Sequence, residues 1–269
     1  MEILTSEFFQ KALLGGLFIG ITAPLVGLFL VLRRLSMIGD TISHVVIAGV
    51  ALGFLVRVYP LLLGIAFAIA ASFAIEKLRK AYKSYAELSL AIMMSGGVAL
   101  ASILFTMGKG FTMDVNSYLF GSIYTLNSTD LWIIGIVTAA VLLVIGTQVK
   151  ELFLITFDEE AASVSGLPVR FYNVMISVLT ALIISVSIKI VGALLVSALL
   201  TIPAACSLII ARSFRQSVIA VVVIGEFALL FGLIIAGVWN LAPGGTVVLL
   251  LIAILLLMLL FRRGIRMGG

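Results

Sequence analysis

Long apolar runs, separated by short polar or charged segments, recur along the whole of this 269-residue chain. An α-helix needs about 20 apolar residues to cross a hydrocarbon core about 30 Å thick, and nine runs approach or reach that length. The pattern predicts an all-α, polytopic membrane protein with about 8–9 transmembrane helices. The predicted spans are residues 8–32, 39–56, 60–74, 88–107, 131–148, 171–188, 190–211, 218–239 and 245–261.

The composition agrees with a membrane location. Charged residues make up 11% of the chain, whereas a soluble domain carries about 25%. No segment outside the predicted spans is long enough for a second globular domain, so residues 1–269 are interpreted as a single transmembrane domain. Residues 1–11 contain Glu2 and Glu7 and lack a positively charged start. We therefore expect the first apolar run to be a retained span and not a cleaved signal peptide.

The distribution of basic residues indicates an orientation. If residues 150–170 lie in the cytoplasm and the spans alternate from there, 13 of the 17 Lys and Arg residues fall on the inner side. Cytoplasmic loops carry such an excess, so the N-terminus is predicted outside and the C-terminus inside. The net charge of +5 then implies no nucleic-acid partner. Two outer basic residues, Arg57 and Lys189, are expected to reach toward the outer headgroups.

Small residues and one short junction add detail to this layout. The sixth and seventh runs meet at Lys189 with almost no loop, which predicts either a tight outer hairpin or a broken helix. Small residues gather at positions 49–53 and 95–97 and favour close helix packing over a role in substrate binding. The single cysteine, Cys206, excludes an intrachain disulfide and is expected to be an inert residue in a packed span.

The single histidine, His44, follows Asp40 by four residues, so both side chains would share one helix face inside an apolar run. Counting about 1.5 Å per residue from Arg34 at the inner surface places His44 about 15 Å deep, near the midplane. Ionisable groups at that depth mark ion or proton pathways. Carboxylate and imidazole groups are ligands of zinc and manganese. Spacing alone leaves two other interpretations open, a helix N-cap around Asp40 and a proton relay.

Glu226 is the other carboxylate expected deep in a span. It is interpreted first as a protonated or hydrogen-bonded residue against a neighbouring helix, and second as an accessory metal ligand or proton site. Polar residues of the predicted outer loop are interpreted as solvated or capping residues. They are Asp114, Asn116, Asn127 and Asp130.

Residues 157–168 predict a short helix on the cytoplasmic face. Asp158 can cap its start, with Glu159 and Glu160 near the positive end of the helix dipole. Gly166, followed closely by proline, gives a helix stop. A short helix between two spans suits docking into a partner's groove, and a plain interfacial helix is the other interpretation.

Four sequence motifs, in order, resemble those of ABC-3 family permeases, the membrane subunits of zinc and manganese uptake transporters. They are RRLSMIGDTISHVVIAGVALG from Arg33, SYLFGSIYTLNSTDLW from Ser117, LFLITFDEEAASVSGLPVR from Leu152 and VGALLVSALLTIPAA from Val191. The resemblance covers nearly the whole chain and is closest to the zinc-uptake branch. Residues 78–84, LRKAYKS, also resemble the sequence of that branch. One departure stands before Pro243, where members often carry an acid and this chain reads Asn-Leu-Ala.

The resemblance implies a type II ABC importer permease in the bacterial cytoplasmic membrane. Two copies would form a homodimer carrying cytoplasmic ABC ATPase subunits, and an extracytoplasmic metal-binding protein would deliver Zn²⁺ or Mn²⁺. Asp40 and His44 match the family's intramembrane metal ligands. A coupling segment of about residues 152–168 matches the family's ATPase-coupling helix. The matching residues there are Phe157, Asp158, Glu159, Glu160 and Gly166.

Transport without ATP hydrolysis on this chain is the expected activity, because the sequence contains no Gly-x-x-x-x-Gly-Lys-[Ser/Thr] loop. The alternative is a secondary, proton-coupled metal transporter that uses Asp40, His44 and Glu226. An intramembrane metalloenzyme ranks last, because catalytic zinc usually takes three protein ligands and a water. No permanently bound cofactor is expected, and an Asp–His pair suits zinc and manganese alike.

Overall fold

The computed structural model describes residues 6–82, 85–108 and 112–267. These residues form helices and no strand, which confirms the predicted all-α class. The helices are α2 (Glu7–Leu32), α3 (Met37–Val56), α4 (Pro60–Ala81), α5 (Ala86–Met107), α6 (Thr112–Phe120), α7 (Ser128–Thr147), α8 (Val149–Phe157), α9 (Glu159–Val164), α10 (Val169–Val191), α11 (Val196–Ile210), α12 (Phe214–Trp239) and α13 (Pro243–Met267). Among the described residues, eight helices are long and apolar enough to cross a membrane: α2, α3, α4, α5, α7, α10, α12 and α13.

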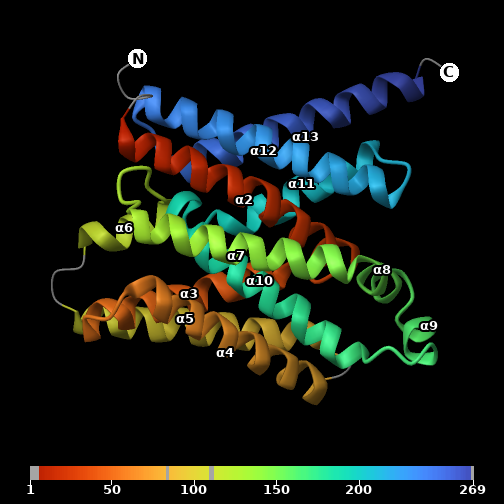
Figure 1. Cartoon of the computed structure of the whole chain (residues 1–269), viewed down its shortest axis with the longest axis horizontal. Coiled ribbons are helices and arrows are strands. Elements are labelled where there is room, and N and C mark those ends of the chain that lie inside the picture. Colours follow the sequence, from red (N-terminus) through yellow and green to blue (C-terminus); the bar gives the residue numbers. More distant parts are fainter. Residues whose placement is uncertain (1–5, 83–84, 109–111, 268–269) are drawn as a thin grey trace.

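The long helices lie side by side, as Figure 1 shows, with the N-terminus and α6 at one end and α8, α9 and the C-terminus at the other. Helix α3 packs against α4 and α5, whereas α2 packs against α11 and α12. Helix α10 joins these groups, because it contacts α2, α3, α4 and α7. The segments expected on the inner side therefore share one end of the molecule. Which membrane face that end meets stays a prediction.

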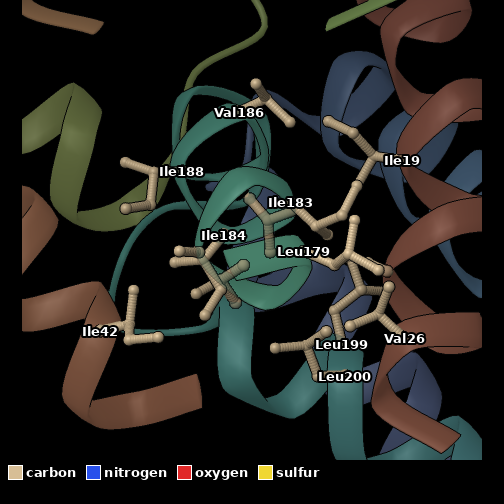
Figure 2. Close-up of a cluster of buried hydrophobic side chains, with 14 of the residues drawn as sticks. Ile19, Val26, Ile42, Leu179, Ile183, Ile184, Val186, Ile188, Leu199 and Leu200 are labelled. Carbon is tan, nitrogen blue, oxygen red and sulfur yellow. The ribbon is translucent and has the colours of Figure 1, made fainter. Parts of the chain in front are cut away.

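Branched apolar side chains form the core around α10. Figure 2 shows Ile183 and Ile184 of α10 among side chains from α2, α3 and α11. Ile19, Ile42 and Leu199, one from each of those helices, are fully buried. A helix that is apolar on all sides is expected to be surrounded by protein or lipid. In α10, 78% of the most apolar window is buried within this chain.

Close packing at small residues is confirmed at both predicted clusters. A Cβ atom at Gly49 would stand 2.7 Å from the carbonyl oxygen of Leu63, and one at Gly97 would stand 3.0 Å from the amide nitrogen of Val45. Gly96, in contrast, faces open space. Lipid tails are as apolar as the side chains, so membrane helices associate through such van der Waals contact. The glycines bring α3 close to α4 and α5.

The junction between the sixth and seventh predicted spans is a tight turn. Helix α10 continues through Lys189, ends at Val191, and is followed by Gly192 with a φ of 89°. Helix α11 then runs back toward the end that holds α8 and α9 (Figure 1). It has 15 residues, and at about 1.5 Å per residue it is shorter than a full span. The structure thus shows the predicted hairpin with a shortened returning helix.

Candidate functional site

Asp40 and His44 lie near the start of α3, both partly exposed. The helix begins at Met37, two residues before the predicted start, and its N-cap position is Ser36. Asp40 therefore does not cap the helix, and that interpretation is wrong. Its carboxylate instead accepts a hydrogen bond from Ser197 Oγ of α11 at 3.1 Å. This contact fixes the carboxylate between α3 and α11.

His44 lines a cavity of about 510 Å³ that opens to the surface of the chain. Ser102 and Thr106 of α5 are the other polar residues of its wall. The apolar lining residues are Ile47, Val98, Ala101, Phe105, Leu119 and Leu194. An ionisable group inside a membrane protein normally faces such a cavity or the interior of a bundle. The position of His44 fits an ion pathway.

As a metal site, the Asp40–His44 pair of one chain would be incomplete. Within the part of the chain that the structure describes, no three His, Cys, Asp or Glu side chains come together to hold a metal ion. Zinc usually takes four ligands, so a carboxylate and an imidazole from one chain supply at most part of the shell. Water or a second copy of the chain has to supply the rest. An open shell suits an ion that must leave again.

Glu226 lies on α12 where this helix meets α2, and it forms no three-residue metal group with Asp40 and His44. Both of its carboxyl oxygens are buried without a hydrogen-bond partner among the described residues. The side chain lies against Gly20, because a Cβ atom there would collide with Glu226 Oε2. Pro24, four residues after Gly20, has no N–H for the Gly20 carbonyl. The close contact with Gly20 supports the interpretation of Glu226 as a residue packed against a neighbouring helix.

The prediction for Lys189 is wrong, because its side chain is buried and does not reach the headgroups. Asp130 is not solvated, but its interpretation as a capping residue is confirmed, because it is the N3 residue of the capping box of α7. Both are buried, and they form an ion pair that ties the end of α10 to the first turn of α7. The Asp130 carboxylate also accepts hydrogen bonds from the Tyr59 hydroxyl and from the Asn127 N–H, the second at 3.0 Å. Asn127 caps α7 as expected. From the sequence alone, a charged residue with no partner nearby in the chain is predicted to be solvated. A charged residue that forms an ion pair in the folded protein can instead stay buried.

The other outer polar residues have simpler surroundings. Arg57 is exposed at the C-cap of α3. Asn116 is exposed on α6, so it is solvated but helical, and the side chain of Asp114 lies outside the described residues. Asn240, in the segment that departs from the family pattern, has a φ of 53° and accepts a hydrogen bond from the Tyr124 hydroxyl at 3.0 Å.

The predicted inner helix is confirmed as α9, which Figure 1 shows projecting at one end of the bundle. The Asp158 carboxylate accepts a hydrogen bond from the Ala161 N–H at 2.8 Å, as an N-cap does. Gly166 has a φ of 83° and ends the turn after the helix. Helix α8 directly precedes α9, so the segment predicted to couple to an ATPase consists of two short helices with Asp158 between them.

The surface around α9 has features of a docking site. Glu159 and Glu160 are exposed and border a hollow of about 670 Å³. Phe157 is 58% exposed, although its ring packs 4.7 Å from that of Phe153 and 6.2 Å from that of Phe214. An exposed aromatic ring beside charged groups is typical of protein interfaces.

Comparison with known proteins places the chain in a family. Residues 5–262 match the ABC 3 transport family. The chain is 34% identical over 243 residues to the manganese import system permease protein ScaB of Streptococcus gordonii, covering 90% of this chain and 87% of that protein. It is 32% identical over 247 residues to the high-affinity zinc uptake system membrane protein ZnuB of Haemophilus influenzae, covering 90% and 93% respectively.

A solved structure agrees with these similarities. The structure described as PsaBC from Streptococcus pneumoniae in complex with Fab contains a chain with a TM-score of 0.84 and 32% identity, covering 95% of this chain and 92% of that one. The manganese and zinc relatives have similar sequence identity to this chain, so the comparisons do not distinguish the expected zinc-uptake branch from a manganese-uptake branch. This chain is a multi-pass membrane protein that belongs to the ABC 3 transport family.

Proposed function

We propose that this chain is the membrane-spanning permease of an ATP-driven importer for a divalent metal ion in the bacterial cytoplasmic membrane. The observation that carries the proposal is the Asp40–His44 pair on α3, in which His44 lines an open cavity and the Asp40 carboxylate accepts a hydrogen bond from Ser197. Membership of the ABC 3 transport family and the names of a manganese and a zinc relative support the substrate class. Zn²⁺ is the first candidate cargo and Mn²⁺ the second.

Asp40 and His44 hold the ion briefly during its passage. In a homodimer, two carboxylates and two imidazoles supply four donors, the number that zinc prefers. Ser197 donates to Asp40 Oδ1 and so orients the carboxylate. Because each chain contributes only two ligands, a small movement between the two copies weakens the site and releases the ion.

ATP binding and hydrolysis occur on separate cytoplasmic ATPase subunits that dock on α8 and α9. The supporting features are the exposed Phe157 ring, the exposed Glu159 and Glu160, and the hollow beside them. Asp158 and Gly166 fix the start and end of α9, so a force that the ATPase applies to this helix displaces α9 as one unit. An extracytoplasmic metal-binding protein delivers the cargo at the opposite face.

Metal uptake by the reconstituted permease–ATPase complex tests this proposal. Asp40→Ala and His44→Ala are each expected to lower ATP-dependent uptake of Zn²⁺ or Mn²⁺ at least about tenfold, because each removes a ligand. Both variants should still co-purify with the ATPase. Wild-type uptake in either variant would sink the assigned role. Uptake that a proton gradient drives without any ATPase would instead establish the secondary-transporter alternative.

A further inference from the structure

Arg33 follows the last residue of α2, and its charged side chain is buried, with 6% exposed. Nη2 donates a hydrogen bond to Asn173 Oδ1 at 2.5 Å and lies 3.8 Å from Glu159 Oε2. Nη1 is buried and has no hydrogen-bond partner in the part of the chain that the structure describes. Burial lowers the pKa of Arg33, and the charge of Glu159 opposes this shift. A buried cation is costly unless it is paired, so the Glu159 contact matters for holding Arg33 there.

The partners of Arg33 belong to the segment around α9. Glu159 is the first residue of α9, and Asn173 lies near the start of α10. Asn173 Nδ2 also donates to Glu159 Oε1 at 3.4 Å. The three side chains therefore contact one another. They connect the start of α9 and the start of α10, the next helix, to the end of α2.

The chain after Arg33 leads directly to the candidate metal ligand. Arg34 has a φ of 57°, and the Leu35 N–H donates to the Leu30 carbonyl at 2.8 Å, so the link between α2 and α3 is a compact hydrogen-bonded turn. Asp40 lies in the first turn of α3. A short, hydrogen-bonded segment therefore joins Arg33 to Asp40.

We propose that Arg33 is a positioning residue that transmits a displacement of α9 to the start of α3 and thereby to Asp40. The inference rests on the proposed function, in which the ATPase moves α9. Nη2 alone reaches both groups, because it donates to Asn173 Oδ1 and lies near Glu159 Oε2, so one guanidinium nitrogen connects Asn173 and Glu159. A lysine ammonium is a compact point charge on a different stem and does not reproduce the position of that nitrogen. Loss of Arg33 separates ATP hydrolysis from metal movement and leaves each partner folded.

The number of metal ions transported per ATP hydrolysed measures this coupling in proteoliposomes that contain the permease–ATPase complex. Arg33→Met is expected to lower the ratio at least about fivefold, with ATP hydrolysis within about twofold of wild type. Arg33→Lys is expected to give an intermediate ratio. The matched control is Arg34→Met, which removes the neighbouring exposed arginine and should keep the wild-type ratio.

Asn173→Leu is the second variant, because it removes the acceptor of the shortest Arg33 contact and lies outside α9. It is also expected to lower the ratio, and it decides the matter if Arg33→Met does not assemble. A wild-type ratio in Arg33→Met, or in Asn173→Leu when the first variant is lost, overturns the inference. A wild-type permease that binds no ATPase would overturn the proposed function itself, so the two failures are distinguishable.

Discussion

Lys189 and Asp130 are both buried, so each depends on the other for charge balance. Lys189→Met leaves the Asp130 carboxylate without a countercharge, and breaking a buried pair in this way costs about 3–5 kcal/mol. We expect a clearly lower unfolding temperature in detergent. The double variant Lys189→Met/Asp130→Asn should recover much of the loss, because asparagine is neutral and still accepts hydrogen bonds. A double variant less stable than the single one would contradict this account.

The Tyr59 hydroxyl donates a hydrogen bond to the Asp130 carboxylate. Burial and this hydrogen bond raise the pKa of Tyr59 from 10.0 to about 12. The folded state therefore binds the proton more tightly than the unfolded state, so the stabilisation is complete below about pH 10 and is lost as the pH rises toward about 12. Unfolding temperatures measured across this window should fall more steeply for the wild type than for Tyr59→Phe. Parallel pH profiles would show that the hydroxyl contributes nothing.

Substitutions of Glu226 test whether this residue packs α12 against α2 or takes part in transport. Glu226→Gln keeps the size and shape of the side chain packed against Gly20 and should preserve assembly and metal uptake. Glu226→Leu places a branched side chain in that close contact, and such overpacking costs about 1–3 kcal/mol, so it should lower the unfolding temperature. A folded Glu226→Gln protein that no longer transports metal would favour the accessory ligand or proton site instead.

The turn between α10 and α11 depends on a glycine in two ways. Gly192 has a φ of 89°, and a Cβ atom there would stand 2.5 Å from the amide nitrogen of Gly121. Gly166 has a similar φ of 83° but nothing within 4 Å. Gly166→Ala should therefore cost only the backbone strain, about 1–2 kcal/mol. Gly192→Ala should cost about 1–3 kcal/mol more, because it also overpacks the turn.

Unfolding temperatures of these two alanine variants, measured in the same detergent, check the difference. Equal losses would mean that the close approach at Gly192 relaxes without cost.

Helix boundaries could be predicted where local chemistry sets them. Asp158 and Gly166 lie within a few residues of the backbone groups that they satisfy, so α9 could be found from the sequence. The end of α10 could not, because the partner of the buried Lys189 charge is Asp130, 59 positions away. The sequence did place Asp130 and Lys189 on the same predicted outer side, and this was the available indication. No local pattern around either residue indicates that the two side chains contact each other.

The candidate site follows the same rule. Asp40 and His44 are one helical turn apart, so their shared face could be predicted from spacing. Ser197 comes from 157 positions away and had no signal beyond being a small polar residue in an apolar run. Arg33 was assigned to the inner surface by its charge, and its burial against Asn173 depends on the packing of α2 against α10.

The orientation of the whole molecule is testable because Cys206 is the single cysteine and is fully buried. On a background without it, Asn116→Cys and Tyr85→Cys place thiols at exposed positions near opposite ends of the bundle. The excess of inner basic residues predicts that an impermeant maleimide labels the first variant in intact cells and the second only after permeabilisation. The reverse pattern would invert the predicted orientation.

The metal content of the purified permease–ATPase complex, loaded separately with zinc and manganese, tests the central claim most directly. The account predicts about one bound ion per two permease chains, since two Asp40–His44 pairs make one four-donor site. Asp40→Ala and His44→Ala should lose the ion, and Glu7→Gln, which changes an exposed carboxylate paired with Lys11, should retain it. Full metal content in the Asp40→Ala/His44→Ala double variant would contradict the account.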